Sequence, residues 1–156
     1  MIQRIQSIYL LAASLVLFTL FLFPVINNLI LNGHPDSIMV TGVYEVINSV
    51  RTKTASFIWL SIATLISALL PLAGIFMYKN RKQQVSYLYI ILVLIIGYSF
   101  LLAETVKGFI GEGTTLSPEN YGLGMIASSL SMVLIIFAIK GINRDEKLVR
   151  SADRLR

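Results

Sequence analysis

The chain alternates between long apolar runs and short polar connections. Apolar residues dominate four segments, 8–25, 57–78, 85–103 and 121–139, and none of these segments contains a charged side chain. An apolar run of about 18 residues or more is long enough to cross the ~30 Å hydrocarbon core of a bilayer as a helix. The pattern therefore predicts an all-α membrane protein with four transmembrane helices packed as a four-helix bundle.

Two connections, 26–56 and 104–120, lie on the same side of such a bundle. The first contains the turn-rich stretch NGHPDS, followed by SIMVTGVYEVINSV, which is rich in β-branched residues. This combination favours a strand or a small β-hairpin over the mouth of the bundle. The second connection contains GFIGEGTTLSPEN, whose glycines and proline are typical of a loop.

Composition strengthens the membrane interpretation. Hydrophobic residues make up 56% of the chain and charged residues only 13%, whereas soluble domains carry about 25% charged residues. The formal net charge of +5 fits basic residues retained on the cytoplasmic side better than nucleic-acid binding. The absence of cysteine excludes disulfides and thiolate metal sites.

The basic residues also predict the orientation of the chain. Four spans place the N-terminus, the second connection and the C-terminal tail on one side, which carries ten Lys and Arg residues against three on the other. Because Lys and Arg are retained in the cytoplasm, both termini of this multi-pass protein are expected to be cytoplasmic. The ten are Arg4, Lys79, Arg81, Lys82, Lys140, Arg144, Lys147, Arg150, Arg154 and Arg156, and the three are Arg51, Lys53 and Lys107.

The residues that carry chemistry are sparse. The single histidine, His34, cannot supply a pair of haem ligands, and the chain contains no G-x-S-x-G elbow and no P-loop. We therefore predict no catalytic residue, no cofactor and no metal site. Glu104, at the outer end of the third span, is a candidate proton or cation site, although a carboxylate that reaches towards the interface is the simpler interpretation.

Small and helix-bending residues lie inside two of the spans. Pro71 removes one backbone donor from the second span and favours a kink beside Ser67. In the fourth span Gly124 and Ser128 are four residues apart, a spacing that lets two helices approach closely. Packing within the bundle is the simpler interpretation, and docking against another membrane subunit is the alternative.

The C-terminal segment 141–156 is expected to be a cytoplasmic unit separate from the membrane domain 1–140. Gly141 interrupts the apolar pattern of the fourth span, and Asn143 and Glu146 have the spacing of a helix capping box. These features predict a short amphipathic helix that begins at Asn143.

This predicted tail helix has an apolar face with Leu148 and Leu155 and a basic face with Arg150 and Arg154. These four residues are our candidates for docking on the anionic membrane surface, on the bundle itself or on a protein partner. Nucleic acid is disfavoured as a partner because acidic residues are interleaved with the basic ones and the tail has no aromatic residue for stacking.

The opening MIQRIQSIYLL, the four-span layout and the closing DEKLVRSADRLR together resemble an uncharacterised family of small four-span bacterial inner-membrane proteins, classed as a domain of unknown function. The resemblance covers the whole chain and is most specific at its ends, 1–6 and 145–156. It implies a location in the bacterial inner membrane, and it implies no activity, substrate or cofactor.

Two functional hypotheses from different classes follow. The first is a non-enzymatic membrane protein, an accessory or scaffold subunit that contacts lipid and docks a membrane or cytoplasmic protein through its helix faces and tail. The second is a small transporter or lipid-handling protein that uses the Pro71 kink and Glu104. Recovery of a stoichiometric partner would favour the first hypothesis, and a substrate flux that depends on Glu104 would favour the second.

Overall fold

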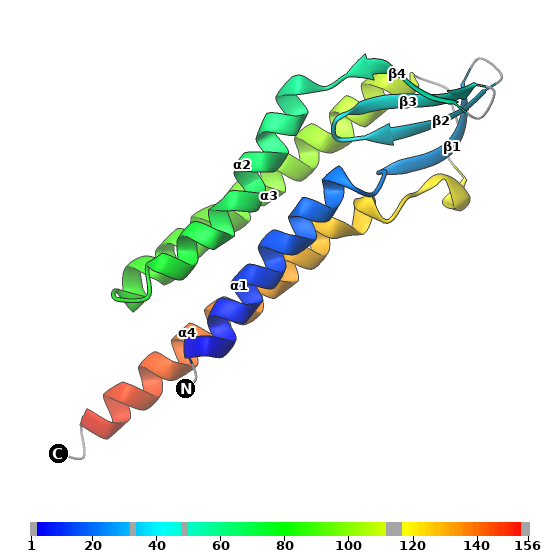
Figure 1. The fold of residues 1–156 in the computed structure, drawn as a ribbon. Helices are drawn as coiled ribbons and strands as arrows, with labels where there is room; N and C mark the ends of the chain where they lie inside the picture. Colours follow the sequence, from blue (N-terminus) through cyan, green and yellow to red (C-terminus); the bar gives the residue numbers. More distant parts are fainter. Residues whose placement is uncertain (1–2, 32–33, 48–49, 112–116, 154–156) are drawn as a thin grey trace.

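The computed structural model contains four helices and a small antiparallel β-sheet at one end of them (Figure 1). It describes residues 3–31, 34–47, 50–111 and 117–153. The helices are α1 (Gln3–Phe18), α2 (Ile58–Phe76), α3 (Arg81–Ile110) and α4 (Gly124–Asp153). The strands are β1 (Ile26–Leu31), β2 (His34–Met39), β3 (Gly42–Ile47) and β4 (Val50–Ser56), and two short 3₁₀ turns are η1 (Thr19–Phe21) and η2 (Pro118–Asn120).

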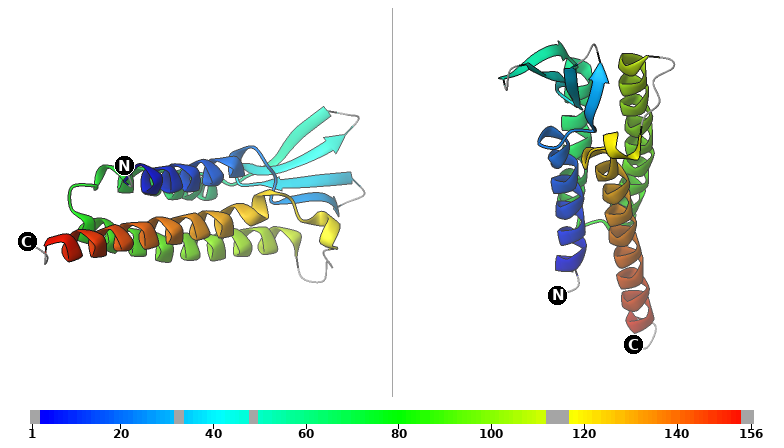
Figure 2. Two further views of the ribbon diagram at one scale, coloured as in Figure 1. Left: turned by 90° about the horizontal axis from the view of Figure 1, so that it is seen from below. Right: turned by 90° about the vertical axis from the view of Figure 1, so that its right-hand side faces the viewer.

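The axes of the four helices lie along a common direction, and each helix contacts two of the others. The most extensive contact joins α1 to α4, the next joins α1 to α2, and α3 contacts both α2 and α4. Figure 2 shows the same arrangement from two further sides, with α1 beside α4 and with the sheet beyond the ends of α1, α2 and α4 but alongside the last turns of α3. Four helices are confirmed as the main body of the protein.

Three of the described helices, α2, α3 and α4, are long and apolar enough to cross a membrane. The apolar helical stretch of the first segment, Ile5–Phe21, is shorter. It ends before the boundary expected from hydropathy because Pro24 disfavours helical geometry at the residue before it and cannot donate a backbone hydrogen bond. The predicted first span of 8–25 is therefore wrong at its end, where the chain leaves the helix and enters β1.

The first connection forms more structure than a hairpin. Its four strands pair in the order β1-β2-β3-β4, each antiparallel to the next, and a two-residue turn links β2 to β3 with Met39 paired opposite Gly42. The part of NGHPDS from His34 onwards lies in β2 rather than in a turn. The predicted small hairpin is thus the centre of a larger sheet, because the segments on both sides of it also pair.

Backbone and hydroxyl contacts hold the sheet against the helices. The hydroxyl of Ser61, in the first turns of α2, donates to the carbonyl of Val40 at 3.0 Å, and the Phe57 amide donates to the Thr41 carbonyl at 3.2 Å. On the other side, the Gly122 amide donates to the Val25 carbonyl at 2.9 Å. The sheet is therefore attached both to α2 and to the start of α4.

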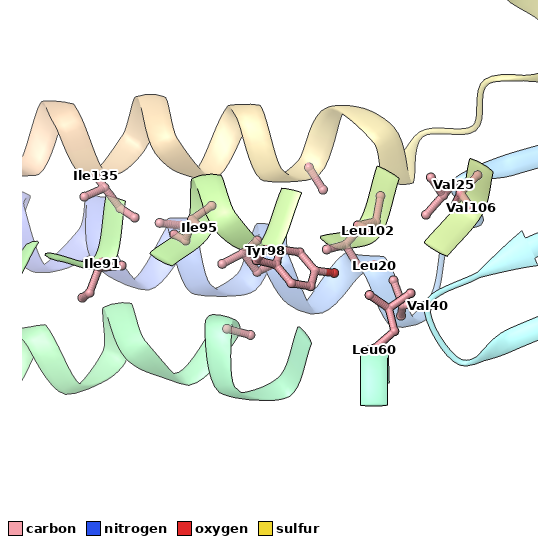
Figure 3. Close-up of a cluster of buried hydrophobic side chains, with 14 of the residues drawn as sticks. Leu20, Val25, Val40, Leu60, Ile91, Ile95, Tyr98, Leu102, Val106 and Ile135 are labelled. Carbon is pink, nitrogen blue, oxygen red and sulfur yellow. The ribbon is translucent and has the colours of Figure 1, made fainter. Parts of the chain in front are cut away.

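A continuous apolar core runs between the helices and reaches the base of the sheet (Figure 3). Ile91 and Ile95 of α3 lie opposite Ile135 of α4, and all three side chains are fully buried. Some polar groups of this core have partners on other helices: the Thr64 and Tyr98 hydroxyls lie 2.8 Å apart, and Ser14 donates to the Ala68 carbonyl at 2.6 Å. The buried Ser131 hydroxyl has no hydrogen-bond partner among the described residues.

The C-terminal tail is not a separate helix. Helix α4 continues through Gly141 and Asn143 to Asp153, so the predicted helix start at Asn143 is wrong. Figure 1 shows the last turns of α4 extending beyond the start of α1 and beyond the connection between α2 and α3. A glycine inside a helix costs about 1 kcal/mol relative to alanine, and the close packing of α1 against Gly141 offsets this cost.

Helix α3 is also longer than expected, since it continues to Ile110. The start of GFIGEGTTLSPEN, predicted as a loop, is therefore helical, and Gly111 ends the helix with a positive φ of 80°. Residues 112–116 of this stretch lie outside the described residues. Hydropathy marks where the apolar residues stop, but a helix can extend past that point.

Candidate functional site

The residues selected from the sequence do not come together in one place. Ser67 and Pro71 are buried on α2, where Pro71 lies inside a helix that continues to Phe76. Glu104 is exposed on α3. Two side chains of α3 hydrogen-bond to the backbone of α2 near Pro71, since Tyr87 donates to the Leu70 carbonyl at 3.2 Å and Gln84 to the Gly74 carbonyl at 2.9 Å.

Gly124 and Ser128 begin α4 and have different surroundings. A Cβ atom at Gly124 would lie 2.9 Å from the Pro24 carbonyl oxygen, so this glycine lets α4 approach the end of the first helical segment. Ser128, one turn further on, is half-buried and lines a cavity on the α3 side.

The tail residues lie at the opposite end of the molecule. The side chain of Leu148 is 53% exposed, and the backbone of Arg150 belongs to α4. Arg154 and Leu155 lie outside the described residues. The tail therefore continues helix α4, and the Leu148 side chain lies on the surface of this helix.

A cavity of about 760 Å³ lies between α3, α4 and the start of β1. Its wall is mainly apolar, and Figure 3 shows Val25, Leu102 and Val106 close together at this end of the core. Ligand sites for small molecules usually enclose about 300–1,000 Å³ and are predominantly apolar with a few polar groups. The cavity has this character. Its apolar lining consists mainly of Val25, Ile26, Leu102, Val106, Ile110 and Met125.

Polar groups occur in two parts of the cavity. Lys107 and Tyr121 line the part nearest the sheet, and Lys107 is exposed. Three serines line the part further along the helices, and one of them, Ser99, donates to the Ile95 carbonyl of its own helix at 2.9 Å. Among the described lining residues, Lys107 carries the only charge.

Local backbone contacts build one side of this cavity. The Gly124 amide donates to the Pro24 carbonyl at 3.0 Å, and Ile26 forms an isolated antiparallel bridge with Tyr121. These contacts hold the start of β1 against the start of α4. The bulky α3 residues Leu102 and Val106 then face small residues of α4 across the gap, including Ser128 and Ser129.

Sequence reasoning missed this cavity although it considered Glu104 and Ser128. Glu104 does not line it, whereas Lys107, one turn further along α3, does. The serines and glycine of α4 indicated packing within the bundle or docking against another membrane subunit, and not a cavity. Whether small residues bring helices together or leave space between them depends on the residues of the facing helix, which spacing along one segment does not reveal.

A second contact lies at the tail end and joins the two ends of the sequence. The Gln6 amide of α1 donates to a carboxylate oxygen of Asp145 on α4 at 2.5 Å, and both side chains are buried. Gly141 makes room for this pair, because a Cβ atom there would lie 3.1 Å from Cγ of Gln6. No pattern in the sequence predicted this contact between residues 139 positions apart.

Three of the described helices are long and apolar enough to cross a membrane, and the cavity is mostly apolar. These are features of an integral membrane protein. Among the described residues, no three His, Cys, Asp or Glu side chains gather closely enough to hold a metal ion. The chain belongs to the family described as "Domain of unknown function (DUF4293)", whose family model matches residues 2–155. No curated protein and no solved structure matches the chain.

Proposed function

We propose that this protein is a non-enzymatic, multi-pass protein of the bacterial inner membrane that acts as an accessory or scaffold subunit of a larger assembly. The four apolar segments of the sequence carry no Asp, Glu, Lys, Arg or His side chain. Transporters and proton pumps usually carry such groups within their spans because substrate and proton pathways need them. This absence favours a role in binding partners over a role in transport or catalysis.

The proposed orientation places both termini in the cytoplasm. The start of α1, the connection between α2 and α3, and the end of α4 lie at one end of the molecule, and the sheet lies at the other (Figure 1). The first end carries ten of the thirteen basic residues. The positive-inside rule therefore supports a cytoplasmic location for this end.

The observation that carries the scaffold proposal is the extension of α4 beyond the other helices. At 30 residues, α4 is about 45 Å long, which exceeds the ~30 Å hydrocarbon core of a bilayer. Its last turns expose Leu148 and Val149, whose side chains are 53% and 49% exposed. Exposed apolar residues that lie beyond the bilayer favour docking against a protein partner.

Extraction in a mild detergent and quantification of co-purifying proteins tests this proposal. We expect one stoichiometric partner, whose recovery falls severalfold when Leu148 and Val149 are both replaced by Ser. Phe76→Ser is the control, because Phe76 is an apolar residue at the same end of the molecule and is even more exposed, at 79%. A protein that is always recovered alone, or a partner that is retained equally by both variants, would contradict the scaffold role.

A further inference from the structure

We propose that the cavity between α3 and α4 binds an acyl chain of an anionic membrane lipid, with Lys107 contacting the lipid headgroup. This inference goes beyond the scaffold role and does not depend on which side of the membrane the sheet occupies. It rests on the position of the cavity along the helices, on the chemistry of its wall and on the location of its single charge.

The position of the cavity matches the outer part of one bilayer leaflet. Along α3 and its C-cap the cavity is lined from Ser99 to Gly111, and the eight helical steps from Ser99 to Lys107 correspond to about 12 Å. Lys107 lies about 33 Å along the helix from Val85, where the apolar run of α3 begins, so it falls near the edge of a ~30 Å hydrocarbon core. The cavity therefore extends inwards from the headgroup level.

From the sheet end of the cavity towards the middle of the helices, the lining changes from charged to apolar. A membrane lipid changes in the same way from its headgroup to its acyl chains. Lys107 and Tyr121 lie at the sheet end, and Leu102, Val106 and Met125 form apolar wall along the helices. A lysine at this level can place its ammonium group among the headgroups while its stem lies on apolar surface. A tyrosine is also typical of the headgroup level.

The charge of the lining favours an anionic headgroup. No carboxylate belongs to the described lining, and the nearby Glu104 does not contribute to it. The Lys107 ammonium can therefore pair with a phosphate of the lipid rather than with a neighbouring residue of the lining. A basic residue near an anionic membrane surface contributes roughly 1 kcal/mol, which corresponds to about a fivefold preference for an anionic lipid over a zwitterionic one.

Crosslinking with photoreactive lipids tests this site in the full-length protein. The protein is reconstituted in phosphatidylcholine vesicles that contain either phosphatidylglycerol or phosphatidylcholine with a photoreactive group on one acyl chain. Crosslinked residues are then mapped by peptide mass spectrometry. We expect crosslinks to concentrate on Leu102, Val106 and Met125, with phosphatidylglycerol about fivefold more efficient than phosphatidylcholine.

Two variants separate the headgroup contact from the chain contact. Lys107→Gln should retain the crosslinks in the cavity and remove the preference for phosphatidylglycerol, because only the charge changes. Val106→Trp should reduce crosslinks from both lipids by filling the cavity. Lys53→Gln is the control, since Lys53 is an exposed lysine of β4 that does not line the cavity. An unchanged thermal unfolding transition in detergent shows that each variant remains folded.

Three outcomes would overturn the proposal. Crosslinks spread evenly over exposed apolar positions such as Ile90 and Val93 would show that the cavity holds no lipid selectively. An unchanged preference for phosphatidylglycerol in Lys107→Gln would show that Lys107 does not contact the lipid headgroup. Protein–protein crosslinks through a photoreactive residue placed at Met125 would show that a helix of a partner, rather than an acyl chain, fills the cavity.

Discussion

Glycines at three positions control how closely the two ends of α4 approach the rest of the molecule. A Cβ atom at Gly122 would lie 2.1 Å from the Pro24 carbonyl oxygen, which is well inside any van der Waals contact. At Gly124 and Gly141 the nearest atoms would be 2.9 Å and 3.1 Å away. At Gly97, in the middle of α3, a Cβ atom would meet nothing within 4 Å. Glycines of the same sequence therefore have very different structural roles.

We predict that Gly122→Ala destabilises the protein, whereas Gly97→Ala does not. The added methyl group at Gly122 must push Pro24 away from the start of α4 and weaken the backbone hydrogen bond from Gly122 to Val25, and overpacking of this kind costs about 1–3 kcal/mol. Gly97→Ala should stabilise α3 by about 0.5–1 kcal/mol because alanine loses less conformational entropy in a helix. Thermal unfolding in detergent measures both effects, and equal transition temperatures for the two variants would contradict the prediction.

At the residue scale the sequence identified some positions of interest but not their partners. The spacing of Gly124 and Ser128 pointed to the surface where α4 meets its neighbours, and Gly124 does lie against Pro24. The buried contact between Gln6 and Asp145 was not predictable, because a polar residue near each end of a chain is ordinarily solvated. Only the packing of α1 along α4 brings these two side chains together.

At the element scale the sequence predicted the helices better than their ends. The second span was expected at 57–78 and is observed as Ile58–Phe76, because its boundaries coincide with changes in both hydropathy and backbone geometry. For α3 and α4 the apolar run ends before the helix does, because the helices continue to Ile110 and to Asp153. The four-stranded sheet was only partly predicted, since β1 and β4 also pair with the strands next to them in sequence, with Leu31 opposite His34 and Ile47 opposite Val50.

The tail end of α4 provides a prediction at this scale. We expect Asp145→Ala to loosen the contact between α1 and α4, because it leaves the buried Gln6 amide without its carboxylate partner, a loss that costs about 1–3 kcal/mol. The chain contains no cysteine, so spin labels can be attached to single cysteines introduced at Ile8 and Lys147, both exposed. The distance distribution between the two labels should broaden.

Arg144→Ala is the matched control for this experiment, since Arg144 is exposed on the same turn of α4. It should leave the distribution as narrow as in the unsubstituted protein. If Asp145→Ala also leaves the distribution unchanged, the Gln6–Asp145 hydrogen bond does not hold the end of α4 against α1. The contact would then be a consequence of helix packing and not one of its causes.

At the scale of the whole molecule the two ends differ in structure as well as in charge. One end consists of a compact sheet attached to α2 and α4, and the other consists of a single projecting helix with basic side chains (Figure 2). The orientation that we propose therefore assigns each end to a different compartment. The sheet would lie outside the cytoplasm, beside the cavity, and the projecting end of α4 would be available to cytoplasmic partners.

Single cysteines test this orientation directly, because the natural chain has none. We expect a membrane-impermeant maleimide to label Thr54→Cys, on the exposed part of β4, in spheroplasts whose inner membrane is intact. Ser151→Cys, exposed near the end of α4, should react only after the membrane is permeabilised. Gly97→Cys, in the apolar middle of α3, should resist the reagent in both conditions because the bilayer excludes it.

Each alternative result has a distinct structural meaning. Reversed labelling of Thr54→Cys and Ser151→Cys would show that the protein has the opposite orientation in the membrane. The projecting helix would then lie outside the cytoplasm, which removes the basis for a cytoplasmic partner. Labelling of both sites before permeabilisation would mean that an even number of helices crosses the bilayer between the sheet and the end of α4, as would occur if α4 did not cross. A third cysteine at Ser7 tests separately whether the shorter first helical segment, Ile5–Phe21, crosses the bilayer, because only this segment separates Ser7 from the sheet. Labelling of Ser7→Cys on the side opposite to Thr54→Cys would show that α1 crosses the bilayer, and labelling on the same side would show that it does not.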